Sequence, residues 1–225
     1  MAEIYQIAID GPAASGKSST ARRVAAELGI QYLDTGAMYR ALTLDVLRHG
    51  LSPSDEAGVL GCLEHLELDW QAGKVWLAGE DVSVPIRENR VSVSMGPLCA
   101  LPAVRAWMVE QQRRVGSRES TVLEGRDIGT VVFPRARFKF FLVADLEERA
   151  RRRLLELTQR GGESSLEELM RELAARDASD AARSTGPLKQ AVDARLLDTT
   201  RLSLDEQTHE ILARVRRWLE STGNG

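Results

Sequence analysis

The segment from Ile4 to Gly29 constrains the fold of this 225-residue chain more than any other segment. It opens with an apolar run, 4–10, that predicts a buried strand. It closes with apolar residues at positions 21, 24, 25 and 28, the spacing of a helix, and Gly29 ends that helix. Between them, positions 11–18 read Gly-Pro-Ala-Ala-Ser-Gly-Lys-Ser and fit the pattern G-x-x-x-x-G-K-[ST]. Backbone N–H groups of such a loop converge on phosphate oxygens at the start of a helix, so we expect a nucleoside triphosphate site.

The loop also predicts roles for individual side chains. Lys17 is expected to reach the β- and γ-phosphates, and Ser18 to place its hydroxyl on Mg²⁺ as the metal ligand. The residues expected to bind the nucleotide are Gly11, Pro12, Ala13, Ala14, Ser15, Gly16, Lys17, Ser18 and Ser19.

The rest of the chain alternates between strand and helix patterns, which indicates a parallel sheet covered on both faces. Further strands are expected at 31–34, 121–124, 138–143 and 195–198, and helices at 37–49 and 102–118. Helix starts are expected at Asp145, Ser165 and Ser203, each followed three residues later by a glutamate. The stretch 66–90 differs: short alternating runs separated by turns at 71–73 and 79–81 predict a small antiparallel insertion.

Composition excludes several classes of protein. No window approaches 18 consecutive apolar residues, so no membrane span is expected, and the first residues lack the pattern of a secretory signal. A net charge of −3 argues against a general nucleic-acid-binding surface. Two cysteines, Cys62 and Cys99, are too few for a disulfide framework, and they are expected to be small apolar fillers in the reducing cytoplasm.

Other motifs narrow the class of nucleotide-binding protein. The guanine clamp Asn-Lys-x-Asp is absent, because neither of the two asparagines is followed by lysine, and motor or transporter ATPases are usually larger. A phosphotransferase for a small acceptor fits better, and it needs a second anion site with mobile cations. Of the 30 basic residues only 4 are lysine, which either codon bias or bidentate phosphate binding by arginine can explain.

Several arginines lie where such an acceptor site is expected. Arg40 follows the second predicted strand, and Arg126 with Asp127 follows the strand predicted at 121–124. In a parallel sheet, the loops after the strand ends line the ligand-binding crevice. Arg176, Asp180 and Arg183 have the spacing i, i+4, i+7 and share one helical face. Taken alone, that stripe is more typical of a solvated row of ion pairs.

Five separated blocks resemble the bacterial cytidylate kinases. They are the phosphate loop, the run 33–40 (Leu-Asp-Thr-Gly-Ala-Met-Tyr-Arg), the run 125–134 (Gly-Arg-Asp-Ile-Gly-Thr-Val-Val-Phe-Pro), 176–188, and 193–200. They occur in the order of that family and span nearly the whole chain. The resemblance favours a functional role for the arginine stripe over a solvated one.

The resemblance implies an α/β fold of the P-loop nucleoside monophosphate kinase type. This fold has a five-stranded parallel sheet with helices on both faces, an inserted small antiparallel β region and a mobile lid. The implied domains are a core of 1–36, 103–157 and 186–225, a monophosphate-binding arm of 37–102 with its β insertion at about 62–101, and a lid of 158–185. The implied enzyme is a monomer that transfers the γ-phosphoryl group of ATP to CMP or dCMP, with Mg²⁺.

The resemblance also implies roles for residues. Lys17, Arg126, Arg176 and Arg183 are the expected catalytic residues. Arg105 and Asp127 should read the cytosine, because a guanidinium donates to its ring acceptors and a carboxylate accepts from its amine. The full set expected to bind the acceptor is Thr35, Tyr39, Arg40, Arg105, Arg126, Asp127, Arg176, Asp180 and Arg183.

The sequence leaves alternatives for several residues and for the function. Gly96 stands where the family commonly has a serine near the cytosine, and Ser94, a backbone group or water could replace it. One of Arg149, Arg152 and Arg153 is expected to contact ATP. The three histidines lie outside the matched blocks and are expected to be surface or packing residues: His49, His65 and His209. Alternative functions are a kinase for UMP, AMP, shikimate or dephospho-coenzyme A, and a nucleotide-binding module without turnover.

Overall fold

A computed structural model describes residues 3–71, 73–159, 161–223, so Ala72 of the predicted turn lies outside the described residues. Five parallel strands form the central sheet in the order β2-β6-β1-β7-β8. Their bounds are β1 Gln6–Asp10, β2 Gln31–Asp34, β6 Thr121–Gly125, β7 Phe138–Val143 and β8 Arg195–Asp198. The predicted five-stranded parallel sheet is therefore confirmed.

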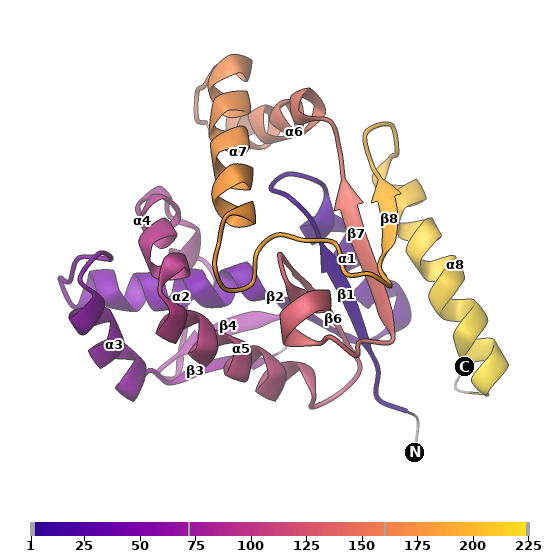
Figure 1. Cartoon of the computed structure of the whole chain (residues 1–225), viewed down its shortest axis with the longest axis horizontal. Coiled ribbons are helices and arrows are strands. Elements are labelled where there is room, and N and C mark those ends of the chain that lie inside the picture. Colours follow the sequence, from indigo (N-terminus) through magenta and orange to yellow (C-terminus); the bar gives the residue numbers. More distant parts are fainter. Residues whose placement is uncertain (1–2, 72, 160, 224–225) are drawn as a thin grey trace.

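Helices cover both faces of this sheet (Figure 1). Among the described residues they are α1 Lys17–Leu28, α2 Thr35–Arg48, α3 Glu56–His65, α4 Asn89–Ala100, α5 Pro102–Gly116, α6 Leu146–Gln159, α7 Leu166–Ala181 and α8 Leu204–Thr222, with a 3-10 turn at Pro85–Arg87 and a π-helical turn at Ile128–Val132. None of these helices combines the length and the apolar character that crossing a membrane requires.

The two faces of β1 show how alternation in the sequence builds two separate cores. Ile7 and Ile9 pack with α1 and α8 on one face, while Ala8 faces the other core. Successive side chains of a strand point to opposite faces, so a strand buried on both sides reads as a continuous apolar run. This explains why the first apolar run forms the central strand.

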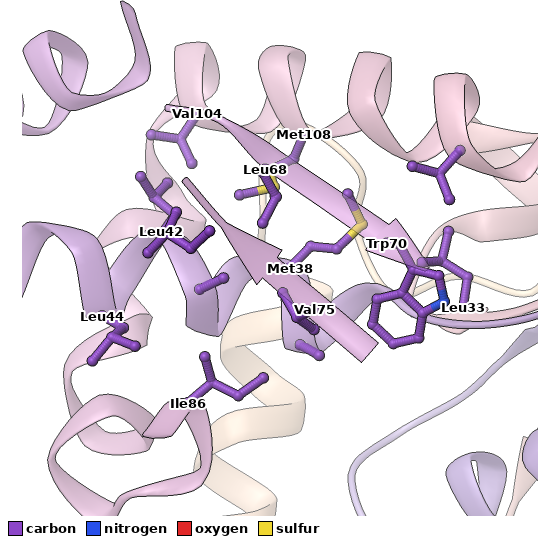
Figure 2. Packing of buried hydrophobic residues seen from close by; sticks show 14 of the residues in the cluster. Leu33, Met38, Leu42, Leu44, Leu68, Trp70, Val75, Ile86, Val104 and Met108 are labelled. Carbon is purple, nitrogen blue, oxygen red and sulfur yellow. The ribbon is translucent and has the colours of Figure 1, made fainter. Parts of the chain in front are cut away.

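The second core joins the sheet to a smaller antiparallel sheet, β3 Leu68–Gln71, β4 Lys74–Leu77 and β5 Glu80–Asp81. Figure 2 shows Met38 and Leu42 of α2 and Met108 of α5 packing toward Leu68 and Trp70 of this sheet. The antiparallel insertion is confirmed, but its strands span only 68–81. The rest of the expected β region, 62–101, holds the end of α3, the 3-10 turn and α4.

The topology places the end of β1 at a switch point. From β1 the chain crosses to β2, returns through β6 beside β1, and continues to β7 on the other side of β1. Ligands of open parallel sheets bind outside the carboxyl ends of strands at such a point. The loops after β1, β6 and β7 therefore lie around one crevice, and α6 and α7 lie beyond the sheet on the same side (Figure 1).

Candidate active site

The loop after β1 has the backbone of an anion cradle. Gly11 and Gly16 have φ angles of 150° and 89°, a region that favours glycine. Gly16 caps α1 without any side-chain hydrogen bond. The first N–H groups of α1 are therefore left for a ligand, and the helix dipole favours an anion there.

Lys17 is buried beneath this loop, with 5% of its surface exposed. Its Nζ donates to the carbonyl oxygen of Pro12 at 2.8 Å. Burial, followed by the positive charge of Arg126, lowers the pKa of Lys17 to about 7. A buried ammonium with one carbonyl partner is poorly compensated, so an anionic phosphate would favour its charged form.

Ser18 and Glu124 form a pair that the sequence did not lead us to predict. Ser18 Oγ donates to Glu124 Oε1 at 2.5 Å, and the Tyr32 hydroxyl donates to the same oxygen at 3.2 Å. A carboxylate and a hydroxyl at the start of the phosphate-binding helix are oxygen ligands of the kind Mg²⁺ takes. The sequence feature that could have identified Glu124 is its position near the end of β6, the strand that pairs with β1.

Asp10 is a second buried carboxylate at the end of β1. Its two oxygens accept hydrogen bonds from the N–H groups of Ile128 and Gly129, at 2.8 and 2.7 Å. Burial raises the pKa of Asp10 to about 6 although these bonds lower it. Asp10 thus positions the loop that follows Arg126 and Asp127.

The residues predicted to bind the monophosphate of the acceptor nucleotide lie in the first two turns of α2. Thr35 Oγ1 donates to the carbonyl oxygen of Glu124 at 2.7 Å, and Arg40 pairs with Asp34 at 2.9 Å. Tyr39 accepts a hydrogen bond from Arg105 at 3.3 Å. These contacts join the predicted monophosphate residues to the predicted base-reading residues.

Arg105 and Asp127 form a buried ion pair, with 4% and 7% of their surfaces exposed. Burial raises the pKa of Asp127 although Arg105 lowers it. Arg105 Nε is also buried and has no hydrogen-bond partner among the described residues. Buried ion pairs contribute little to stability, whereas an unused donor next to a carboxylate suits a polar ligand.

Arg126, Asp180 and Arg183 form one cluster. Arg126 Nε lies 2.6 Å from Asp180 Oδ2, Arg183 pairs with the other oxygen, and Asp180 is 2% exposed. Partial desolvation, followed by the charge of Arg126, lowers the pKa of Arg176. Within the described part of the chain Arg176 has no ion-pair partner. Arg183 lies two residues beyond the end of α7, so the predicted single helical face holds only Arg176 and Asp180. Asp180 joins α7 to the loop after β6 through Arg126, so this set is not merely a solvated row of ion pairs.

Three arginines of α6, one of which is expected to contact ATP, have different neighbours. Arg149 pairs with Asp177 of α7 and donates to the carbonyl oxygen of Ala13 in the phosphate loop at 3.2 Å. Arg152 instead donates to the Thr199 carbonyl oxygen at 2.6 Å, and Arg153 pairs with Glu156 on the surface. Of the three, Arg149 donates directly to the phosphate loop, and Arg152 lies close to the same loop, since a Cβ built at Gly16 would be 3.7 Å from Arg152 Nη1.

Gly96, where a serine near the cytosine is common in the family, makes no close contact among the described residues. It is exposed on α4, and a Cβ built there would meet no atom within 4 Å. Ser94 is half-buried on the same helix. A cytosine contact from α4 stays a prediction.

Gly186, which the sequence did not lead us to predict, lies against the Arg105–Asp127 pair. It has a φ angle of +59°, and a Cβ built there would overlap Arg105 Nη2 and Asp127 Oδ2. The backbone at this position therefore packs directly against the Arg105–Asp127 pair.

Gly186→Ala should lower kcat/KM for the acceptor by about a hundredfold, because small misplacements of binding groups have effects of that size. Gly50→Ala is the matched control, since Gly50 has φ +70° and open space around it. Steady-state kinetics and Tm of both variants provide the check. Equal losses in the two variants would show that backbone strain alone is responsible.

A parallel sheet with a phosphate loop, a buried lysine and a facing arginine cluster defines a small P-loop phosphotransferase. The sequence pattern of the cytidylate kinase family matches residues 7–217. The chain is 44% identical over 212 residues to a cytidylate kinase of Caldanaerobacter subterraneus subsp. tengcongensis, covering 94% of this chain and 95% of that protein. It is 46% identical over 220 residues to one of Chlorobaculum tepidum, covering 95% and 94%. The chain belongs to the cytidylate kinase family.

A solved structure of an uncharacterized protein from Eubacterium ventriosum ATCC 27560 shares the fold. It superposes with a TM-score of 0.54 at 13% identity, covering 96% of this chain and 99% of that chain. At this identity the likeness concerns the fold alone.

Proposed function

We propose that the chain transfers the γ-phosphoryl group of ATP to CMP or dCMP and that the residues above carry out this reaction. Family membership supports the reaction. The observation that carries the residue assignment is the buried Arg105–Asp127 pair, placed between the acceptor residues on α2 and the arginine cluster. That pair offers a donor and an acceptor of the kind the cytosine edge requires.

Each half of the site would hold one polyanion. On the donor side, the N–H groups of α1 and Lys17 would bind the ATP phosphates. On the acceptor side, Thr35, Arg40 and Arg126 would bind the monophosphate. The acceptor phosphate is already a nucleophile, so the protein needs to align the two phosphates and neutralise charge rather than supply a strong base.

Arg176 and Arg183 would complete the charge neutralisation from the lid. Both are basic residues near the C-terminal end of α7, and Asp180 between them holds Arg126 and Arg183 in one cluster. Donors aimed at developing charge are most effective where water is excluded. The lid would therefore be catalytically complete only when it covers both nucleotides.

Ser18 and Glu124 fit the expected Mg²⁺. When bound, the ion would neutralise charge on the β- and γ-phosphates. In the described structure the two side chains already share a hydrogen bond, and Tyr32 fixes the same carboxylate oxygen. They would hold the ion at the N-terminus of α1.

Glu124→Gln tests this assignment. The amide keeps an acceptor for Ser18 and Tyr32 but loses the negative charge, so the Mg²⁺ concentration for half-maximal activity should rise at least about tenfold. Glu119→Gln, just before β6 and exposed, is the matched control. An Mg²⁺ dependence that is unchanged in Glu124→Gln would exclude Glu124 as a ligand.

The same proposal includes a monomer acting in the cytoplasm. Support for the cytoplasm comes from Cys62 and Cys99, both free thiols in the structure.

An acceptor panel tests the proposed specificity. ADP release from ATP and Mg²⁺ is measured with CMP, dCMP, UMP, AMP, shikimate and dephospho-coenzyme A. We expect CMP and dCMP to give the highest kcat/KM. A higher value for any other acceptor would overturn the assignment, and ATP binding without turnover of any acceptor would favour a binding module.

A further inference from the structure

A cluster of three metal-ligating side chains lies on the arm, outside the site described above. Asp45 is on α2, His49 caps the C-terminus of α2, and Cys62 is on α3. One ligand atom of each lies within 4.8 Å of the other two. In Figure 1 the α3 helix lies at the left edge of the molecule, far from the loop after β1.

A cavity of about 370 Å³ opens beside the cluster, and its lining adds a second imidazole, that of His65. Asp45, His49 and Cys62 line the same cavity. One pocket thus presents carboxylate, imidazole and thiol groups together with space for a solvent molecule. The hydrogen bonds within the cluster are the Cys62 thiol to the Asp45 carboxylate and His49 Nδ1 to the Asp45 carbonyl oxygen, at 2.9 Å.

The spacing suits a small tetrahedral ion. Zinc bonds of 2.0 to 2.3 Å place neighbouring ligand atoms about 3.3 to 3.8 Å apart. His49 Nδ1 lies 3.7 Å from Asp45 Oδ1. The His49 side chain is 63% exposed and can rotate to shorten the longer distances, since water would replace its bond to the carbonyl oxygen.

We propose that Asp45, His49 and Cys62 bind one divalent transition-metal ion of the zinc type, with His65 or water as the fourth ligand. Thiolate and imidazole select such ions over Mg²⁺, which prefers oxygen ligands. Binding displaces the thiol proton to solvent, so the site holds the Cys62 thiolate. The ion links the C-terminal end of α2 to α3.

The position of the site predicts a structural effect rather than a catalytic one. Arg40 and His49 are nine residues apart along α2, about 13 Å. An ion at His49 therefore touches no residue placed in the phosphoryl-transfer site. It stabilises the folded arm, because a ligand that binds only the folded state raises Tm.

Cobalt provides a direct test, because a Co²⁺–thiolate bond gives a charge-transfer absorption band. Untagged full-length protein without nucleotide is titrated with Co²⁺ in excess Mg²⁺, which occupies the oxygen ligands of the catalytic site. We expect a band that saturates at one equivalent and is lost in Cys62→Ser. His49→Ala should raise the apparent Kd for Co²⁺ at least about tenfold.

Cys99→Ser and His209→Ala are the matched controls, and both should keep the band. The kinase activity of each variant with Mg²⁺ shows that it is folded. Zinc should raise the Tm of the original chain and not that of Cys62→Ser. The proposal is overturned if Co²⁺ gives no band with the original chain, or if Cys62→Ser keeps the band.

Discussion

Lys17→Ala should lower kcat by about a thousandfold or more, because removal of one preorganised charge from a transition state has effects of this size. The buried ammonium of Lys17 lies under the phosphate loop. Lys189→Ala removes an exposed lysine and should leave kcat unchanged. Single-turnover kinetics separate a loss in the chemical step from a loss in ATP binding.

The fold of this variant is expected to survive, since the pKa of Lys17 falls from 10.5 to about 7 on folding. A basic group with a lowered pKa opposes folding while it is charged, below about pH 7, and the penalty is relieved as pH rises from 7 to 10.5. Lys17→Met, which keeps the aliphatic chain, should therefore be at least as stable at neutral pH. Near-normal turnover in Lys17→Ala would rule out the proposed role.

Asp127→Ala should lower kcat/KM for CMP by about a hundredfold to a thousandfold, because a site that loses a hydrogen bond to its substrate discriminates against it by such factors. The KM for ATP should change by less than about threefold, because we assign Asp127 to the proposed acceptor side of the site. Asp205→Ala, whose carboxylate is 75% exposed, is the control. Unchanged CMP turnover would show that Asp127 does not read the base.

Asp127→Ala is also expected to lower the stability of the fold, so a second variant is needed to measure specificity separately. Removal of Asp127 leaves Arg105 buried without its partner, a change that typically costs about 3–5 kcal/mol. The double variant Arg105→Met with Asp127→Leu replaces the pair by apolar side chains and should recover most of the lost Tm. It should not recover CMP turnover, so specificity and stability are measured separately.

Local sequence patterns were sufficient to predict most strands of the central sheet. The strands predicted at 31–34, 138–143 and 195–198 match the observed strands in their bounds, and α1 ends at Leu28, directly before the predicted stop at Gly29. Ser165 with Glu168 and Ser203 with Glu206 form the capping boxes that their spacing predicts. These signals depend on residues within one or two turns, which is why sequence alone contains them.

The arm was harder to predict because tertiary packing overrides local preference there. The segment Asn89–Ala100 contains Gly96 and Pro97 and alternates valine with serine, yet it forms α4. Val91 and Leu98 are fully buried in the core that α2 and the small sheet share. Burial of these side chains favours the helix in spite of its composition.

Sequence motifs were sufficient to propose the members of the site but not the contacts between them. Blocks of sequence indicated Lys17, Arg126 and Asp127, whereas the partners of these residues come from distant segments. Asp10 accepts from the N–H of Ile128, 118 residues away, and Glu124 accepts from Ser18, 106 residues away. Such pairs depend on strand order, which brings β6 beside β1.

We propose that two nucleotides bind with their phosphates facing each other between the loop after β1 and the arginine cluster. A cytidine–adenosine dinucleotide joined by five phosphates mimics both at once, so its inhibition pattern tests the claim directly. We expect it to compete with ATP and with CMP and to bind more tightly than either. Competition with only one of the two substrates, or affinity no higher than that of the single nucleotides, would contradict it.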